Sequence, residues 1–130
     1  MAICAVIALM PEVLVLDEPT GELDPQSSRD LFALLAELNE RSGITIVVAE
    51  QKTSLLCEFA RELAVLRKGE LTMQGPVRDI LARGAELSAA GVAVPPAARL
   101  AARLTARGLY AGAAPVNLGE AETMVREAAA

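Results

Sequence analysis

The feature that most constrains the fold is a short run of Val and Leu residues, Val13–Leu16, that ends directly in two carboxylates, Asp17 and Glu18. A continuous run of this kind predicts a central strand of a parallel sheet, buried on both faces. The residues that follow such a strand lie at its carboxyl end, which is the edge at which α/β sheets bind ligands. The sequence therefore places two acidic side chains where an α/β protein is expected to hold a ligand.

The segments after this run complete a strand–helix–strand unit. Asp24-Pro25 is typical of a helix N-cap with proline at the first helical position, and Ser42-Gly43 predicts the end of that helix. Ile44–Ala49 is a second β-branched run. Because a helix separates the two runs, we expect the strands to pair in parallel, in an α/β fold.

The apolar segment at residues 2–9 predicts a helix that other elements enclose. Pro11 interrupts the apolar run well before it reaches a membrane-spanning length, and no basic region precedes it, so a signal peptide is not indicated. Cys4 and Cys57 lie in apolar helical stretches without metal-ligand spacing. Both are expected to be ordinary buried thiols, as in a reducing cytosol.

Composition limits the kind of partner. Apolar residues make up 53% of the 130-residue chain and charged residues 22%, which is typical of a globular protein. The formal net charge is −5, and aromatic residues make up 2%. The chain therefore has neither a basic surface for nucleic acid nor aromatic platforms for stacking bases, and no nucleic-acid partner is predicted.

The second half of the chain predicts a hairpin and then helices. A short helix is expected at Thr53–Phe59, and Lys68-Gly69 indicates a tight turn between two strands. After about residue 84 alanine dominates and β-branched runs vanish. We therefore expect a sheet domain at residues 1–83 and a small helical C-terminal appendage at residues 84–130, with helices at 95–107 and after residue 117.

Four segments occur in a characteristic order, namely Asp17–Thr20, Leu23–Pro25, Glu50-Gln51 and Leu66–Leu71. This set resembles the second half of ABC transporter ATP-binding subunits, with the Walker B strand, the D-loop, the switch-loop strand and the hairpin after it. The resemblance implies a partial P-loop NTPase fold with a parallel sheet and flanking helices. It also implies ATP and Mg²⁺ as the cofactors.

The C-terminal segments point to one group within this family. Gly75–Ile80, Ala90–Pro95, Leu100–Leu109 and Asn117–Glu127 look like the C-terminal region of energy-coupling-factor ATPases. Those proteins drive bacterial importers of vitamins and of cobalt or nickel ions. The resemblance implies a second ATPase subunit, identical or paralogous, a transmembrane coupling subunit and a substrate-binding membrane subunit. The expected location is cytoplasmic, on the inner face of the cell membrane through those partners.

The resemblance also assigns roles by position. Asp17 is the expected magnesium carboxylate, and Glu18 the catalytic carboxylate that polarises the attacking water. Asp24 is expected at the seam between two ATPase subunits, where it senses nucleotide. Two plainer interpretations stay open, since Asp17 and Glu18 can simply end a strand as solvated charges, and Asp24 can simply cap a helix.

Two departures from the family pattern bear on activity. Gln51 stands at the switch position where the family often has histidine, and glutamine can donate a hydrogen bond but cannot become cationic. We expect a site that hydrolyses ATP slowly, the alternative being that glutamine supports near-normal turnover. The chain also lacks a Gly-x-x-x-x-Gly-Lys-Ser/Thr phosphate loop and a Ser-Gly-Gly-Gln signature.

The missing motifs lead to two further expectations. The absent part is expected directly upstream, with Met1 an internal methionine or a truncated start, and the isolated chain is expected neither to bind ATP tightly nor to hydrolyse it. An inactive remnant or regulatory subunit that acts only through protein contacts is the competing hypothesis. A DNA-repair or chromosome-organising ATPase is disfavoured by the acidic charge balance and the importer-like tail.

Overall fold

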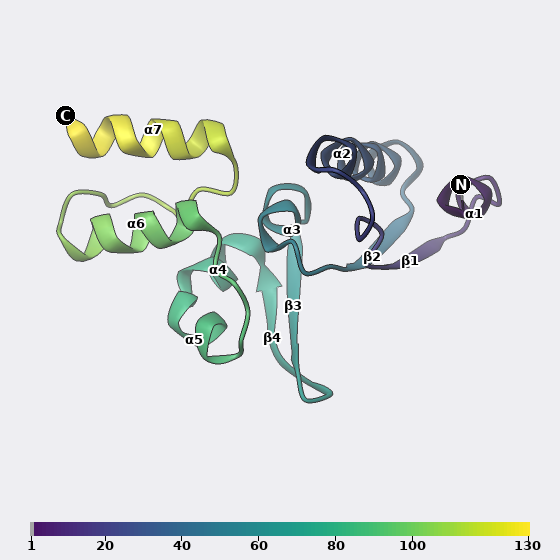
Figure 1. Cartoon of the computed structure of the whole chain (residues 1–130), viewed down its shortest axis with the longest axis horizontal. Coiled ribbons are helices and arrows are strands. Elements are labelled where there is room, and N and C mark those ends of the chain that lie inside the picture. Colours follow the sequence, from purple (N-terminus) through teal and green to yellow (C-terminus); the bar gives the residue numbers. More distant parts are fainter. Residues whose placement is uncertain (1) are drawn as a thin grey trace. The chain divides into compact units, whose positions relative to one another are not determined.

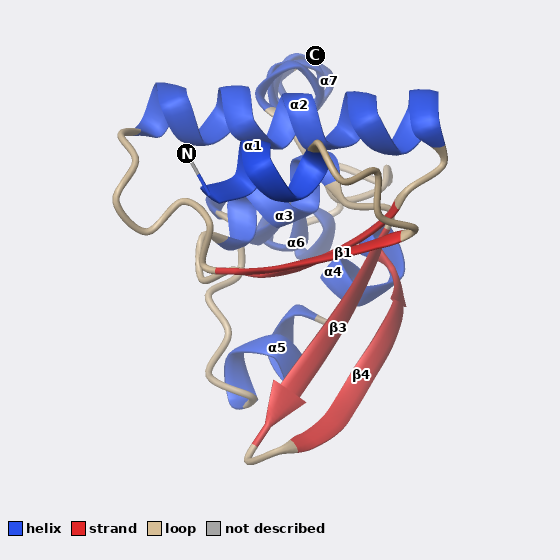
Figure 2. Ribbon diagram, turned by 90° about the vertical axis from the view of Figure 1, so that its right-hand side faces the viewer, coloured by secondary structure: helices blue, strands red, loops and turns tan. Residues whose placement is uncertain are grey.

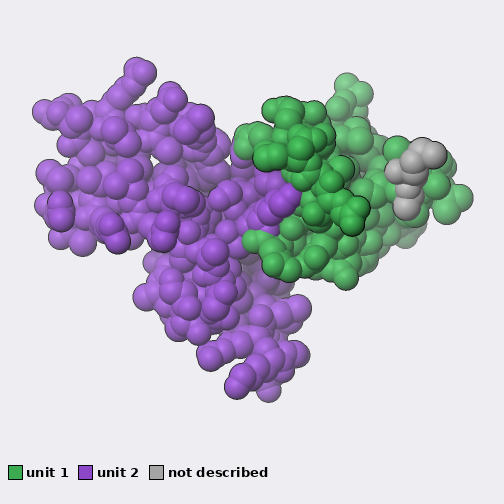
Figure 3. Space-filling model, viewed as in Figure 1, with its two compact units in different colours: residues 1–51 green, residues 52–130 purple. Residues whose placement is uncertain are grey.

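The computed structural model describes residues 2–130, which form two compact units that divide after Gln51 (Figure 3). The elements of unit 1 are α1 (Ala2–Ile7), β1 (Val13–Asp17), α2 (Pro25–Ser42) and β2 (Thr45–Ala49) (Figure 1). Those of unit 2 are α3 (Thr53–Phe59), β3 (Glu62–Arg67), β4 (Glu70–Pro76), α4 (Val77–Ala82), α5 (Gly84–Ala89), α6 (Pro96–Ala106) and α7 (Leu118–Ala129).

Unit 1 contains the predicted strand–helix–strand arrangement. β1 and β2 pair in parallel, in a register that sets Val13 opposite Thr45 and Asp17 opposite Ala49. Helix α2 connects the two strands, and Gly43 ends it in the left-handed conformation, with φ of 67°, that glycine adopts without steric cost. The α/β fold and the parallel pairing predicted from the sequence are thereby confirmed.

The core of unit 1 lies on one face of the β1–β2 ribbon. Leu14 and Leu16 of β1 pack with Leu35 of α2 and Ile44, and α1 and α2 cover this face (Figure 2). Val13 and Val15 alternate with them and are 56% and 69% exposed. The prediction of a strand buried on both faces is therefore wrong for the described residues, because helices cover only one side of the ribbon.

The first helix is also less enclosed than its composition suggested. Ile3 and Ile7 pack against the core of unit 1, whereas Val6 is 42% exposed. Cys4 is exposed, so the prediction that both cysteines are buried holds only for Cys57. An apolar side chain can face solvent wherever the helix contacts a single neighbour, and composition alone does not reveal which face that is.

Unit 2 is built around an antiparallel hairpin. β3 and β4 are joined at Lys68 and Gly69, whose φ values of 52° and 82° are the positive pair that a tight, strand-matching turn requires. The predicted hairpin and the helix at Thr53–Phe59 are both confirmed. Among residues 2–130, no helix combines the length and the apolar character needed to cross a membrane.

The hairpin and the later helices share one core. Val65 and Met73 of the hairpin cluster with Ile80 of α4, Leu87 of α5 and Ala98 of α6. The chain therefore divides into two compact units after Gln51, whereas the sequence suggested a domain boundary at residue 83. The boundary between a sheet domain at residues 1–83 and a helical appendage at residues 84–130 stays a prediction.

The small helical C-terminal region ends in helices α6 and α7, which contact each other. Asn117 caps α7, since its side chain accepts a hydrogen bond of 2.9 Å from the backbone N–H of Glu120, as the sequence predicted. Three arginines of the α6 region recur at i, i+4 spacing and are all exposed, namely Arg99, Arg103 and Arg107. They therefore form a solvated face in the described structure.

Candidate functional site

The carboxyl ends of β1 and β2 bring the predicted site residues together. Asp17 is the last residue of β1 and lies exposed opposite Ala49, the last residue of β2. One residue further, the backbone N–H of Glu18 donates a hydrogen bond of 2.8 Å to the carbonyl oxygen of Ala49. The parallel register therefore holds the loop after β1 beside the loop after β2.

Glu18 and Gln51 contact each other directly at this edge. The Gln51 Nε2 donates a hydrogen bond of 2.5 Å to the Glu18 Oε1, although the two residues are separated by 33 positions. Glu18 has a φ of 44°, a left-handed conformation that costs a residue with a side chain on the order of 1 kcal/mol. The hydrogen bond from its backbone N–H to Ala49 and the bond from Gln51 to its carboxylate restrain Glu18, which is exposed.

A second contact between the two loops was not predicted from the sequence. The Thr20 Oγ1 donates a hydrogen bond of 2.5 Å to the Glu50 Oε2, and Thr20 is fully buried. The other carboxylate oxygen, the Glu50 Oε1, accepts a hydrogen bond of 2.9 Å from the backbone N–H of Gln51. The order Asp-Glu-Pro-Thr identifies the loop but does not reveal that the threonine turns inward, so no sequence signal pointed to Glu50.

Asp24 lies in the described structure as a helix N-cap. Its side chain accepts hydrogen bonds from the backbone N–H groups of Gln26 at 2.9 Å and Ser27 at 3.0 Å, and from the Ser27 hydroxyl. The Ser27 hydroxyl, followed by these backbone donors, lowers the pKa of Asp24. The capping interpretation is thereby confirmed, while the cross-subunit role stays a prediction.

The fit of Mg²⁺ to this edge depends on the donor set. Among residues 2–130, no group of three or more Cys, Asp or Glu side chains is arranged to hold a metal ion by itself. Mg²⁺ is usually bound through one or two carboxylates together with water and substrate phosphates. The single exposed carboxylate of Asp17, at the end of a rigid strand, fits that mode of binding and would not form a cage of its own.

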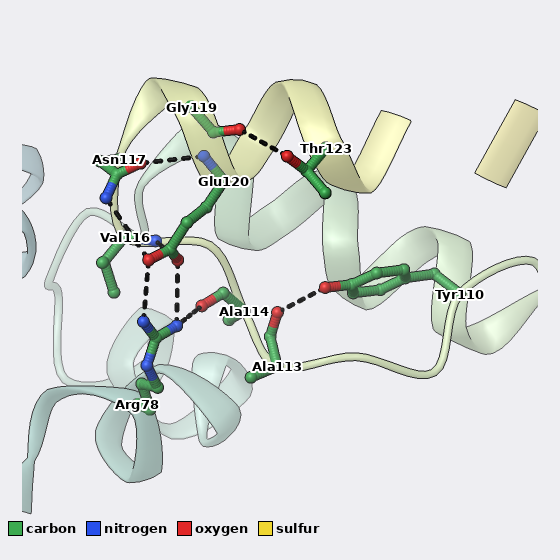
Figure 4. A network of polar contacts seen from close by, with 9 residues as sticks. All are labelled: Arg78, Tyr110, Ala113, Ala114, Val116, Asn117, Gly119, Glu120 and Thr123. Carbon is green, nitrogen blue, oxygen red and sulfur yellow. Dashed lines mark hydrogen bonds and ion pairs between the residues drawn. The ribbon is translucent and has the colours of Figure 1, made fainter. Parts of the chain in front are cut away.

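Unit 2 contains a separate polar cluster between α4 and α7 (Figure 4). The Arg78 guanidinium binds both carboxylate oxygens of Glu120, at 2.9 and 3.1 Å, and also donates to the carbonyl oxygen of Ala114. A hollow of about 470 Å³ lies beside it, lined in part by Tyr110 and Asn117. Because these polar side chains already bond to one another or to the backbone, the cluster serves to attach α7.

This ion pair makes the stability of unit 2 depend on pH. The Arg78 guanidinium, as the largest influence, lowers the pKa of Glu120 below its usual 4.5. A lowered folded-state pKa means that the stabilisation is present above the unfolded value and is lost as the pH falls through the folded value. Glu120→Gln is expected to cost less than about 1 kcal/mol at pH 7, because both partners are partly exposed.

Urea unfolding at pH 7 and pH 3 checks this expectation. The difference in the free energy of unfolding between the wild-type chain and Glu120→Gln should be measurable at pH 7 and smaller at pH 3. Glu122→Gln, at an exposed position of the same helix, is the matched control. An equal difference at both pH values would contradict the role assigned to the pair.

Comparison with known proteins adds independent information. No family model matches the chain. It is 36% identical, over 97% of its length, to the energy-coupling factor transporter ATP-binding protein EcfA2 of Symbiobacterium thermophilum. It is also 36% identical, over 84% of its length, to the putative ABC transporter ATP-binding protein PH1815 of Pyrococcus horikoshii. The chain covers 43% and 38% of these two relatives, which is less than half of each.

A solved structure agrees with these sequence relatives. The structure of cbiO1 from Clostridium perfringens, described as part of the ABC transporter complex cbiONQ, matches with a TM-score of 0.59 and 29% identity. The match covers 76% of this chain and 39% of that protein. The similarity in fold therefore extends over three quarters of the chain.

Proposed function

Because the chain belongs to the ATP-binding subunits of ABC transporters and is most like those of the energy-coupling-factor type, we propose that it contributes the hydrolytic carboxylates of an ATPase site. The observation that supports this most directly is the hydrogen bond from Gln51 to Glu18, next to Asp17 at the strand ends. Solvated charges that merely end a strand have no need of such a partner.

In the proposed reaction Glu18 orients a water molecule toward the terminal phosphate of ATP and accepts its proton. A positioned base of this kind typically contributes roughly 10²–10⁴ in rate. Gln51 donates to one oxygen of Glu18, which leaves the other oxygen available to the water. The amide of Gln51 stays neutral throughout, so it orients the carboxylate but does not relay a proton.

Mg²⁺, bound with the nucleotide, would supply positive charge to the phosphate oxygens, and Asp17 is the residue we propose to hold it. Asp17 lies one position before Glu18 on the same strand end, so one rigid element would position both groups. Asp24 keeps its proposed second role at the seam with another ATPase subunit, since a capping carboxylate remains exposed to a partner.

The proposed setting is an importer for vitamins or for cobalt or nickel ions. The partners would be a second ATPase subunit, a transmembrane coupling subunit and a substrate-binding membrane subunit. We place the chain on the cytoplasmic face of the membrane, held there by those partners. The similarity to energy-coupling-factor ATP-binding proteins and to a protein of the cbiONQ complex supports this setting.

A chimaera tests the proposed activity, since the chain itself contains no phosphate-loop motif. The part of an ATP-binding subunit that this chain does not match would come from the Symbiobacterium thermophilum relative and be joined to residues 1–130. The chimaera, assembled with partner subunits, is expected to release phosphate from Mg-ATP, whereas the 130-residue chain alone is expected to show neither tight ATP binding nor hydrolysis. A folded, ATP-binding chimaera without hydrolysis would favour the non-catalytic alternative.

Gln51→His tests whether the switch residue slows the site. Histidine places a donor in a similar position and can also carry a positive charge, so we expect phosphate release by the chimaera to rise by about tenfold. Gln51→Asn, which keeps the amide on a shorter side chain, is the matched control and should lower the rate. No gain with histidine would show that glutamine supports full turnover.

A further inference from the structure

The loops at the ends of β1 and β2 are joined in a closed ring of contacts. The backbone leads from Glu18 to Thr20, the Thr20 hydroxyl bonds to the Glu50 carboxylate, the backbone leads on to Gln51, and the Gln51 amide returns to Glu18. A third hydrogen bond, from the Gln51 backbone N–H to the Glu50 Oε1, links two residues within the ring. Each strand end therefore restrains the other.

Thr20 is the buried anchor of this ring. It is fully buried, and a buried hydroxyl requires a hydrogen-bond partner because its desolvation is otherwise uncompensated. The Thr20 hydroxyl donates to the Glu50 carboxylate, and a hydrogen bond to a charged acceptor is stronger than one between neutral groups. Glu50 is thus held at a defined place by a residue of the other loop.

We propose that Glu50 is a positioning residue for the ATPase site. Thr20 holds Glu50 in place, Glu50 positions Gln51, and Gln51 in turn positions the Glu18 carboxylate. This inference rests on the proposed function, since it assigns Glu50 a role in the reaction that it exerts through Gln51 and Glu18. Glu50 accepts from Thr20 with one oxygen and from the Gln51 backbone with the other. It therefore fixes the backbone from which the Gln51 side chain reaches Glu18.

The chemistry of the ring distinguishes Glu50 from an ordinary surface carboxylate. A glutamate that served only solubility would be replaceable by any polar residue without effect on Glu18. In the proposed arrangement the position of Glu18 depends on the two carboxylate oxygens of Glu50, which accept from Thr20 and from the Gln51 backbone. Glu18 also has a left-handed backbone conformation, which the surrounding contacts must stabilise. Loss of either acceptor should widen the range of positions that the Glu18 carboxylate samples.

The first experiment uses the 130-residue chain and needs no hydrolysis. The probe is the side-chain amide signal of Gln51 in ¹⁵N–¹H NMR spectra, which reports the hydrogen bond to Glu18. Thr20→Val removes the hydroxyl while nearly keeping the shape, and Glu50→Ala removes the acceptor at a half-buried position. Both are expected to move the Gln51 side-chain signal toward that of a solvated amide, whereas Thr20→Ser keeps the hydroxyl and should leave it in place.

The second experiment measures phosphate release by the chimaera with the same variants. Thr20→Val and Glu50→Ala are expected to lower kcat by about tenfold with less than a twofold change in KM, since misplacement of a reacting group affects the chemical step. Thr20→Ser should retain at least half of the wild-type kcat. A purely structural role would instead reduce the fraction of folded, active protein in Thr20→Val and Glu50→Ala and leave kcat per active site unchanged.

The two experiments separate the inference from the proposed function. Unchanged Gln51 signals in both Thr20→Val and Glu50→Ala would overturn the positioning role, whatever the chimaera does. If the signals move but the wild-type chimaera hydrolyses no ATP, the ring exists and the assignment of Glu50 to an ATPase reaction is overturned together with the proposed function. If Thr20→Val does not fold, Glu50→Ala alone decides the outcome.

Discussion

Replacing Glu18 with glutamine is expected to reduce phosphate release by the chimaera by roughly 10²–10⁴-fold, the usual contribution of a positioned base. Glutamine keeps the shape of the side chain and can still accept the hydrogen bond from Gln51, but it does not take a proton from water. The loss should therefore appear in kcat, with KM changed less than twofold. Steady-state phosphate release at saturating Mg-ATP provides the measurement.

The matched control for this substitution lies four residues away. Glu22 is exposed in the loop that leads to α2, and Glu22→Gln changes the charge by the same amount. We expect this variant to stay within twofold of the unmodified chimaera. If Glu18→Gln also stayed within twofold, the catalytic assignment of Glu18 would be wrong, and the carboxylates would be no more than the charged end of a strand.

The second large effect concerns the stability of unit 2. Ile80 is 2% exposed and packs in the cluster that joins the hairpin to the later helices. Ile80→Ala is expected to lower the free energy of unfolding of this unit by about 2–5 kcal/mol, because it removes buried methyl and methylene groups and leaves a cavity. A loss of this size is a large part of the total stability of a domain, about 5–15 kcal/mol.

Tyrosine fluorescence during urea unfolding measures this loss selectively. Tyr110 is the one tyrosine of the chain, which has no tryptophan, so the signal reports on unit 2 alone. Leu66→Ala serves as the control, since Leu66 is 70% exposed and its truncation should change the stability by less than about 0.5 kcal/mol. If the Ile80 variant does not fold, Ile80→Val should still cost about 0.5–1.5 kcal/mol. Equal effects at the two positions would contradict the proposed core.

Local patterns predicted several elements of this protein closely. The helix at Thr53–Phe59 begins and ends where predicted, and the turn at Lys68-Gly69 joins two strands. Such features depend on residues that are neighbours in the chain, including caps, turn formers and short apolar runs. The family resemblance was legible for the same reason, because its motifs are short and occur in a set order.

Contacts between segments that are distant in the chain could not be predicted from local sequence patterns. The pattern at Val13–Leu16 predicted burial on both faces, yet Val15 is largely exposed, because burial depends on which elements cover each face and not on the strand itself. The same limit applied to Arg78 and Glu120, whose pairing joins positions that are 42 residues apart. Neither position carries a local signal for its partner.

The carboxylates at the end of the first strand show which features the sequence determines and which depend on the tertiary structure. By itself the sequence determined that Asp17 and Glu18 end a strand of a parallel α/β unit and that Gln51 follows the next strand, since strand propensity and chain order are local properties. Only the tertiary structure decided that Thr20 turns inward to meet Glu50 and that the Gln51 amide reaches Glu18. Those contacts depend on the register between two strands that are nearly thirty residues apart, and register is set by packing of the whole unit.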